Sequence, residues 1–378
     1  MPQPHHAPHP AKSEYIYGID LVRFACAVSV TAFHLTWMTP GIAWFLPFGW
    51  VGVQVFFVIS GLVIANSAQG ATPRQFMTGR FLRIYPTAWC AAAISWPLFL
   101  WAGYAKGGYG LEPLYFSVIL FPGPYLATAY WTLPIELAFY FVVYTLITFH
   151  GFKHIRVLAI FLILWGTPYL IALGLNSRGL VRWGWVDFQY LWANMSLLRY
   201  GPYFGLGILV WLFKDKRLGK LGVGAAGLAL AAAILEIYAK TVEVLPKFAG
   251  SPLAPETPWN HLATPGVVAF FIAFAAILVS VKLNHRFPAN PALRKTVRLL
   301  GLTTYPLYLL HERVGEFFIL QFKRLGLADL SAALVALVCT GLVSFAIAWY
   351  FEPRLRGLLK KAGGVLSSGV KKPVFETT

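Results

Sequence analysis

The sequence predicts an all-α, polytopic integral membrane protein with about ten transmembrane helices and both termini in the cytoplasm. Two observations concern composition: 58% of the 378 residues are hydrophobic and only 12% are charged, whereas soluble domains average about 25% charged residues. The third observation is that apolar segments recur from residue 19 to residue 352. A soluble domain and a protein with a single membrane anchor are therefore both excluded.

Each predicted helix corresponds to an apolar segment of roughly the 20 residues needed to cross the hydrocarbon layer. The ten segments are 19–39, 48–66, 85–103, 135–150, 155–175, 193–213, 220–238, 263–283, 297–320 and 327–352. Residues 113–134 are also apolar, but prolines interrupt them, as in a re-entrant or surface segment that lines a cavity. An even number of spans places both termini on the same side of the membrane.

The basic residues indicate which side that is. With the N-terminus in the cytoplasm, 21 Lys and Arg residues lie in inner loops and tails, and seven lie in outer loops. Such an excess on short loops is typical of the cytoplasmic side. The net charge of +17 is then explained by anionic lipid headgroups, and the bilayer rather than nucleic acid is the expected partner.

Three parts follow from this pattern: a disordered N-terminal tail over 1–14, a membrane domain over 15–352 and a basic cytoplasmic tail over 353–378. The N-terminal tail is polar and contains no short apolar core after a charged start, so no cleavable signal peptide is expected. The three cysteines are far apart and have no ligand spacing. Neither a metal site nor a disulfide is expected.

Residues 72–84 alternate aromatic and aliphatic residues with arginines, among them Arg80 and Arg83, and Pro86 follows. This pattern predicts a short amphipathic helix on the cytoplasmic surface. Its arginines either hold lipid phosphates or face a cavity, where they would bind a phosphate-rich ligand. The sequence leaves both interpretations open.

The first span contains three ionisable residues, Asp20, Arg23 and His34, and such residues inside a membrane are usually functional. Asp20 and Arg23 are three residues apart and can form an ion pair. Eleven residues separate Arg23 from His34, which places them on nearly one helix face, about 16 Å apart along the axis. One cleft can therefore contain both, although a hydrogen-bonded core histidine and an arginine that reaches the surface remain the alternative.

Glu136 is a carboxylate surrounded by aromatic and aliphatic residues. A carboxylate in this setting is either protonated or paired with a cation, and Arg23, Arg199 and His311 are the available partners. We expect Glu136 to support the site by orienting a histidine or an arginine.

Two further polar residues lie at membrane depth. Ser60 precedes Gly61 and is most simply a small residue that allows close helix packing. His311 is followed by Glu312, so it either faces the interior or marks the outer end of its span.

Five sequence segments occur in a fixed order along the chain: GIDLVRFACAVSVTAFH, GWVGVQVFFVISGLVI, RFLRIYP, YWTLPIELAFY and GLTTYPLYLLH. Together they resemble the membrane acyltransferase-3 family, and the resemblance covers about residues 15 to 352. The residues that match the motifs of this family are Arg23 and His34, Arg80 and Arg83, Trp131 and Glu136, and Tyr308 and His311.

The resemblance implies an O-acyltransferase in a bacterial inner membrane. Such an enzyme transfers an acyl group, commonly acetyl, from cytoplasmic acetyl-CoA or another acyl-CoA to a hydroxyl group. The acceptor is a glycan, a lipid-linked sugar or a glycosylated small molecule. No permanently bound cofactor is implied, because acyl-CoA is a substrate.

The implied chemistry suits the candidate residues. A hydroxyl is a weak nucleophile, so a histidine that removes its proton during attack is useful, and we assign His34 to this role. Arg23 is too distant along the helix for that task, so we assign it with Arg80 and Arg83 to coenzyme A. Two routes remain open: direct attack on the thioester, and transfer through an acylated His34 or Ser60.

Two other classes of protein remain alternatives. A transporter or flippase of lipid-linked glycans often shows internal repeats and paired broken helices, which are not visible here. A polytopic glycosyltransferase usually has an acidic pair in an outer loop near the start of the chain, where only Asp20 is available.

Overall fold

The structure is a computed structural model that describes the chain except for residues 1–14, 38, 40, 41, 43–45, 105–107, 109, 182, 185–190, 245–259 and 363–378. Every regular element within the described residues is a helix, which confirms the all-α prediction. The predicted N-terminal tail and most of the predicted C-terminal tail lie outside the described residues.

The elements in chain order are α1 (Tyr17–Thr36), η1 (Gly49–Val51), α2 (Gly52–Ala68), α3 (Pro73–Trp101), α4 (Glu112–Ile119), η3 (Thr128–Trp131), α5 (Thr132–Phe149), η4 (Phe152–His154), α6 (Ile155–Ser177), α7 (Leu191–Met195), α8 (Gly201–Lys214), α9 (Gly219–Val244), α10 (Asn260–Lys282), η6 (Asn284–Arg286), α11 (Pro291–Arg324), α12 (Asp329–Ala346), the π-helical turn η7 (Ile347–Phe351) and α13 (Glu352–Ala362).

Seven helical stretches in the described part of the chain are long and apolar enough to cross a membrane. Helices α3 and α11 are also long, at 29 and 34 residues, but both carry several arginines. Helix α8 is apolar but has only 14 residues, about 21 Å of helix. The count of ten spans and the cytoplasmic placement of the termini therefore stay predictions.

The structure differs from two of the predicted segments. The segment 193–213 is not one helix, because α7 ends at Met195 and Leu197 adopts a φ of 61° before α8 begins. The segment 72–84 is not a separate surface helix. Thr72 forms a capping box that starts α3, and the helix continues through Pro86. A proline removes one backbone donor, which a long membrane helix tolerates.

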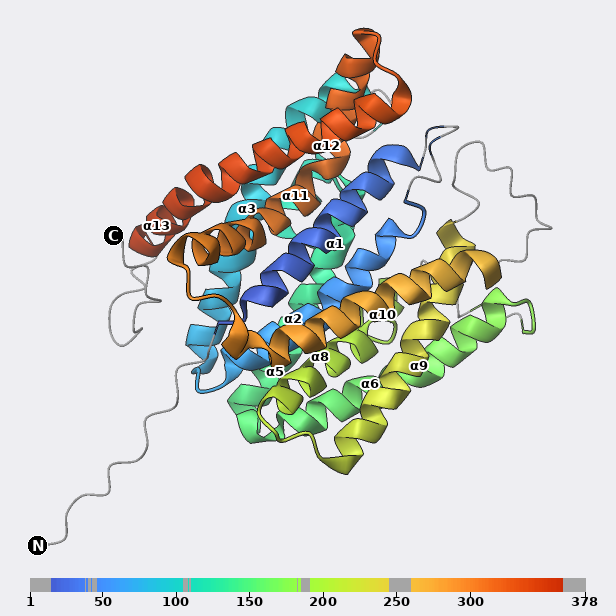
Figure 1. The fold of residues 1–378 in the computed structure, drawn as a ribbon, viewed down its shortest axis with the longest axis vertical. Coiled ribbons are helices and arrows are strands. Elements are labelled where there is room, and N and C mark those ends of the chain that lie inside the picture. Colours follow the sequence, from blue (N-terminus) through green and yellow to red (C-terminus); the bar gives the residue numbers. More distant parts are fainter. Residues whose placement is uncertain are drawn as a thin grey trace, which may run out of the picture.

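Helix α1 lies in the middle of the bundle, where it packs against α2, α10, α11 and α12. Figure 1 shows α3, α11 and α12 on one side of α1, and α6, α8 and α9 on the other. Helix α2 packs against α8, and α5 contacts both α2 and α3. This arrangement brings α1, α2, α3, α5 and α11 around one region.

Helices α2 and α8 approach so closely that glycine is required where they cross. A Cβ atom on Gly61 would lie 2.1 Å from the carbonyl oxygen of Phe204, and one on Gly207 would lie 1.9 Å from that of Val58. Small residues permit such backbone contact between membrane helices. The close packing expected at Ser60 and its neighbour is thus made by Gly61.

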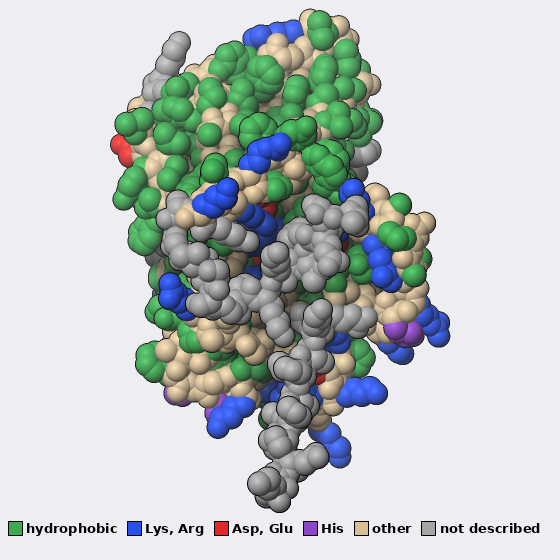
Figure 2. Space-filling view, turned by 90° about the vertical axis from the view of Figure 1, so that its left-hand side faces the viewer, with side chains coloured by type: hydrophobic (Ala, Val, Ile, Leu, Met, Phe, Trp, Pro, Cys, Tyr) green, Lys and Arg blue, Asp and Glu red, His purple; other side chains and the backbone are tan. Residues whose placement is uncertain are grey.

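The described ends of the chain lie at the same end of the bundle. Tyr17 at the start of α1 stacks on Phe287 with ring centroids 4.8 Å apart, and Arg83 of α3 lies 3.8 Å from Glu352 at the start of α13. The predicted C-terminal tail therefore begins as a helix, which packs against α3. Figure 2 views this side and shows Lys and Arg side chains mainly over its middle and lower parts, below an upper part that is largely hydrophobic.

Candidate active site

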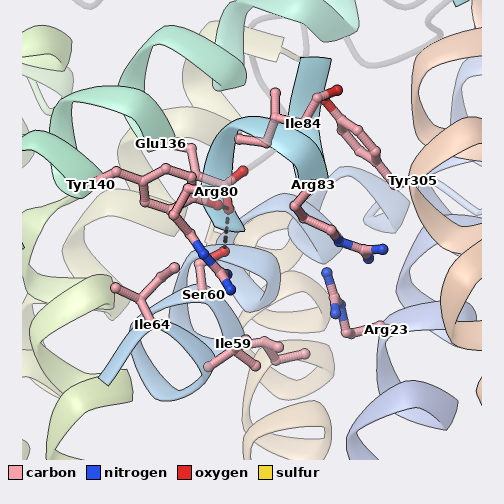
Figure 3. Close-up of a pocket in the computed structure, with 11 residues that line it drawn as sticks. Arg23, Ile59, Ser60, Ile64, Arg80, Arg83, Ile84, Glu136, Tyr140 and Tyr305 are labelled. Atoms are coloured by element: carbon pink, nitrogen blue, oxygen red, sulfur yellow. Dashed lines mark hydrogen bonds between the residues drawn. The ribbon is translucent and has the colours of Figure 1, made fainter. Parts of the chain in front are cut away.

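A cavity that is partly open to solvent, with about 430 Å³ of empty space, lies between α1, α2, α3, α5 and α11. Three arginines line it, Arg23 from α1 and Arg80 and Arg83 from α3. Figure 3 shows the side chains of Arg23 and Arg83 pointing toward each other across the cavity. The concentration of positive charge suits an anionic ligand.

Glu136 is the carboxylate that lines this cavity. Its Oε1 atom accepts hydrogen bonds from the hydroxyls of Ser60 at 3.0 Å and Tyr140 at 2.5 Å, and the bond from Ser60 is drawn in Figure 3. The contact with Ser60 joins α2 to α5, whereas Tyr140 lies on α5 itself. Ser60 therefore faces the cavity as a hydrogen-bonding group rather than serving only as a small packing residue.

Of the three cationic partners predicted for Glu136, the structure places only one beside the same cavity. Arg23 lines the same cavity, but Arg199 forms a buried ion pair with α9 at 2.9 Å and His311 contacts His34. The latter two residues are therefore wrong as partners, because helix packing directs them to other groups.

Arg80 and Arg83 differ in how they are held. The guanidinium of Arg80 lies 5.9 Å from the ring centroid of Phe76 and 6.0 Å from that of Tyr140. Its buried Nε atom has no hydrogen-bond partner among the described residues. Arg83 lies 3.8 Å from Glu352. Of the two interpretations of these arginines, the structure places both on the cavity, with Arg80 able to donate a further hydrogen bond.

A second compartment, also partly open and with about 510 Å³ of empty space, adjoins the first. The two compartments share Arg23, Ser60, Glu136 and Tyr305, and the second extends to Tyr308. Apolar residues of α2 and α5 form much of its remaining wall. The two adjoining compartments define a path from the arginine cluster, between α2, α5 and α11, to Tyr308.

Two histidines lie next to the far end of this path. The rings of His34 and His311 have centroids 4.7 Å apart, and the ring of His311 lies 5.8 Å from that of Tyr308. Nδ1 of His34 donates to the carbonyl of Val30 at 3.0 Å, and Nδ1 of His311 donates to the carbonyl of Tyr308 at 2.7 Å. Because a carbonyl only accepts, each Nδ1 carries a hydrogen, and Nε2 of each neutral ring keeps its lone pair.

Glu312 fixes the position of the histidine pair relative to η3. Its carboxylate accepts hydrogen bonds from the backbone N–H groups of Thr128 at 2.6 Å and Ala129 at 3.0 Å, and from the hydroxyl of Thr128. Its Oε1 atom lies 3.9 Å from Nε2 of His311. The start of η3 is thereby joined to α11, and a negative charge is held beside the two imidazoles.

One comparison with known proteins gives a match. A family model described as an acyltransferase domain, Acyl_transf_3, matches residues 16–352. The chain belongs to the acyltransferase-3 family. No curated protein and no solved structure matches the chain. The resemblance seen in the sequence motifs is confirmed, and the matched region, which marks a membrane acyltransferase, includes all the candidate site residues.

The predicted ion pair between Asp20 and Arg23 is wrong for this acyltransferase. Asp20 accepts a hydrogen bond from the hydroxyl of Tyr15 and packs against Gly301 of α11, where a Cβ atom would lie 2.3 Å from its carboxyl carbon. No ion pair within 4.0 Å joins Asp20 and Arg23 in the described structure. Arg23 is instead available to the cavity.

Trp131, the remaining residue of the sequence motifs, is not among the residues that line either compartment. Its ring contacts those of Tyr200 and Phe57, with centroids 5.4 and 6.3 Å away, and Nζ of Lys240 lies 6.0 Å from its centroid. Trp131 therefore supports the wall of the second compartment by packing behind Phe57.

The structure adds four residues that the sequence analysis did not assign to the site: Tyr140, Tyr305, Glu312 and Glu352. Tyr140 lies four residues after Glu136, and this spacing places both on one helix face. This spacing is the sequence pattern from which a place for Tyr140 beside Glu136 could have been predicted. Glu312 meets the start of η3, and Glu352 meets Arg83 of α3 as well as Arg356 of its own helix. The sequence carries no local signal for the contacts with η3 and α3.

Replacing Glu136 with glutamine tests whether its charge supports the acyltransferase site. Glutamine keeps an acceptor oxygen for Ser60 and Tyr140, but it removes the negative charge beside three arginines. We expect Glu136→Gln to destabilise the protein by about 1–2 kcal/mol, because charge-assisted hydrogen bonds become neutral ones, and to reduce acyl transfer. Thermal unfolding in detergent and an activity assay measure the two effects.

Ser60→Ala is the matched control, because it removes one hydrogen bond and leaves the carboxylate charged. We expect a smaller loss in this variant. If Glu136→Gln matched the wild type in both measurements, the ionisation of Glu136 would have no role.

Proposed function

We propose that this membrane acyltransferase transfers an acyl group, most simply acetyl, from cytoplasmic acyl-CoA to a hydroxyl of a carbohydrate or glycosylated acceptor. One observation carries the proposal: a cavity lined by Arg23, Arg80 and Arg83 adjoins a second compartment that extends to Tyr308, and the ring of Tyr308 lies beside the paired imidazoles of His311 and His34. The enzyme acts in the bacterial inner membrane with the arginine end toward the cytoplasm.

The arginine end binds the phosphate groups of coenzyme A. Arg23 and Arg83 point toward each other, and like charges held close together repel each other. A phosphate between them relieves this repulsion and accepts hydrogen bonds from both. Arg80 adds its unpaired Nε donor. Arginine binds phosphate through several N–H groups at once, which gives charge-assisted and directional contacts.

The second compartment receives the extended pantetheine arm. Arg23 and His34 are separated along α1 by about 16 Å, so a thioester held by its phosphates at the arginines reaches the histidines only through an arm of this kind. The wall between them is largely apolar, with Val53, Phe56 and Leu133 among its residues. This lining suits the alkyl part of the arm and limits the access of water to the thioester.

His34 then acts as the general base. Its Nε2 lone pair takes the proton of the acceptor hydroxyl while the oxygen attacks the thioester carbonyl carbon. The tetrahedral intermediate collapses with cleavage of the C–S bond, and the proton on His34 passes to the departing thiolate. The products are the ester and free coenzyme A. We favour direct attack because the hydroxyl of Ser60 donates to Glu136 rather than to an imidazole.

Purified enzyme in detergent or liposomes tests the proposal. We expect release of the free coenzyme A thiol from acetyl-CoA that depends on an added hydroxyl acceptor, and mass spectrometry of glycans from a deletion strain identifies that acceptor. Acetyl-CoA turnover that never responds to an acceptor, or transport without ester formation, would contradict it.

Arg80 and Arg83 are tested by substitution with glutamine. Each variant is expected to raise the KM for acyl-CoA about tenfold or more, with little change in the KM for the acceptor, because a charge-assisted contact of roughly 1.5–3 kcal/mol is lost. Steady-state kinetics with each substrate varied in turn measures the effect.

Arg74→Gln is the matched control, because Arg74 belongs to the same helix but is exposed and does not line the cavity. It should leave both KM values near those of the wild type. Equal effects at Arg74 and Arg80 would indicate that these arginines bind lipid rather than acyl-CoA.

A further inference from the structure

Three groups that commonly bind metal ions converge at the far end of the path. One ring nitrogen each of His34 and His311 and one carboxylate oxygen of Glu312 all lie within 4.8 Å of one another. His311 is fully buried, and its Nε2 atom has no hydrogen-bond partner among the described residues. The sequence suggested no metal site because these residues come from opposite ends of the chain.

In the tautomers that the two histidines adopt, none of the three converging atoms is a hydrogen-bond donor. Nδ1 of each ring donates to a backbone carbonyl within its own helix, so the converging Nε2 atoms are both acceptors in the neutral rings. The Glu312 carboxylate is an acceptor as well. Three acceptors that face one another are satisfied by an electron-pair acceptor between them, and a metal cation is such a group.

We propose that His34, His311 and Glu312 form a binding site for a divalent transition-metal ion of the Zn²⁺ class. Two imidazoles and one carboxylate are a preferred ligand set for zinc, and three protein ligands leave a fourth coordination position open. Zinc–ligand bonds of about 2.0–2.1 Å place tetrahedral ligand atoms about 3.3 Å apart. The cluster reaches this spacing if the side chains move inward by about 1 Å.

The surroundings already hold the ligands as a metal site requires. Metal-binding histidines commonly donate their other N–H group to a carbonyl or carboxylate, which fixes the ring. Both histidines do so here. The backbone N–H groups of Thr128 and Ala129 donate hydrogen bonds to the Glu312 carboxylate. One carboxylate oxygen can therefore turn toward the ion while the carboxylate stays hydrogen-bonded to the backbone.

The ion has a consequence for activity that rests on the proposed function. It occupies the Nε2 lone pair with which His34 would take the acceptor proton. Zn²⁺ should therefore inhibit acyl transfer in competition with the hydroxyl acceptor and without competition from acyl-CoA. Binding of the ion itself is independent of the proposed function, so the two can fail separately.

The test uses the full-length protein with His5, His6 and His9 replaced by alanine, so that no imidazole of the N-terminal segment, which lies outside the described residues, competes for the probe. Co²⁺ is the probe, since its visible absorption reports coordination, and Zn²⁺ is added to displace it. We expect one Co²⁺ per chain, displaced by Zn²⁺. His311→Ala and His34→Ala should each weaken binding by about 100-fold or more, since even the loss of a supporting hydrogen bond to a ligand costs 10–100-fold.

His154→Ala is the matched control. His150 and His154 are exposed and have ring centroids 6.4 Å apart. They form a second histidine pair that belongs to no metal-ligand cluster among the described residues. The control should keep wild-type affinity and stoichiometry. Glu312→Gln, which keeps an acceptor for Thr128, should weaken binding and Zn²⁺ inhibition together.

The outcomes separate the possibilities. Absence of saturable Co²⁺ binding up to millimolar concentrations would overturn the proposal, as would equal binding by the wild type and by both His34→Ala and His311→Ala. Loss of binding in His154→Ala alone would place the ion at the surface pair and likewise overturn it. Specific binding without any acyltransferase activity would support the metal site and count against the proposed function only.

Discussion

His34→Ala is expected to lower kcat by about 10² to 10⁴, the scale for loss of general-base assistance. His34 lies next to the far end of the path that begins at the arginines, and its Nδ1–H bond to the Val30 carbonyl leaves Nε2 to accept a proton. The substitution removes the base but none of the cavity-lining arginines. Folding and acyl-CoA binding should therefore remain close to those of the wild type.

Two comparisons make this test specific. His34→Gln should not restore activity, because an amide does not accept the proton. His154→Ala should leave kcat unchanged, because His154 is exposed and lines neither compartment. Isothermal titration with coenzyme A and single-turnover kinetics separate binding from chemistry. Normal turnover in a folded His34→Ala preparation would move the assignment to His311, whose Nε2 lone pair lies in the same cluster.

The largest expected effect on stability is that of Gly207→Ala. Its new Cβ atom would lie 1.9 Å from the carbonyl oxygen of Val58 and 2.8 Å from the backbone nitrogen of Leu62. Both contacts are with backbone, which cannot rotate away, so α2 and α8 must separate. We expect a loss of about 1–3 kcal/mol or more, as for other substitutions that overpack an interior.

Gly224→Ala is expected to change the stability of the protein in the opposite direction. Gly224 belongs to α9, and a Cβ atom there would meet nothing within 4 Å. Alanine in an open helix position gains about 0.5–1 kcal/mol relative to glycine. The apparent Tm in detergent should therefore fall for Gly207→Ala and hold or rise for Gly224→Ala. Equal Tm values for these two variants would be incompatible with the observed approach of α2 to α8.

Movement of α2 also bears on activity. Ser60 stands next to Gly61 and donates to Glu136 across the cavity. A shift of α2 away from α8 changes the wall that supports both compartments. The Gly207→Ala variant is therefore expected to lose activity together with stability. A change in the KM for acyl-CoA alone should not account for the loss.

The site residues within one helix were predictable. Arg23 and His34 are both on α1, and the 3.6-residue repeat of a helix fixes their relative direction and separation. Arg80 and Arg83 are likewise three residues apart on α3 and line one cavity. The sequence pattern and the family motifs identified these residues because their geometry depends only on local structure.

The errors have a common physical origin. Asp20 was expected to pair with Arg23 because they are close in sequence, but it contacts Tyr15 and the α11 backbone at Gly301. From the sequence alone Arg199 was a possible cationic partner of Glu136, yet it forms a buried ion pair with α9. In each case several partners of suitable charge existed, and helix packing selected one of them.

The amino-acid sequence by itself determined that the chain is helical, apolar and built from membrane-spanning segments, because water is absent from the bilayer core and each span must satisfy its own backbone hydrogen bonds. It also determined which residues share a face of α1. Only the tertiary structure decided that Ser60 meets Glu136, that Glu312 holds η3 beside His311, and that Arg83 meets Glu352. These pairs join different helices, and their contact depends on the direction and depth at which the helices cross, which no local sequence pattern specifies.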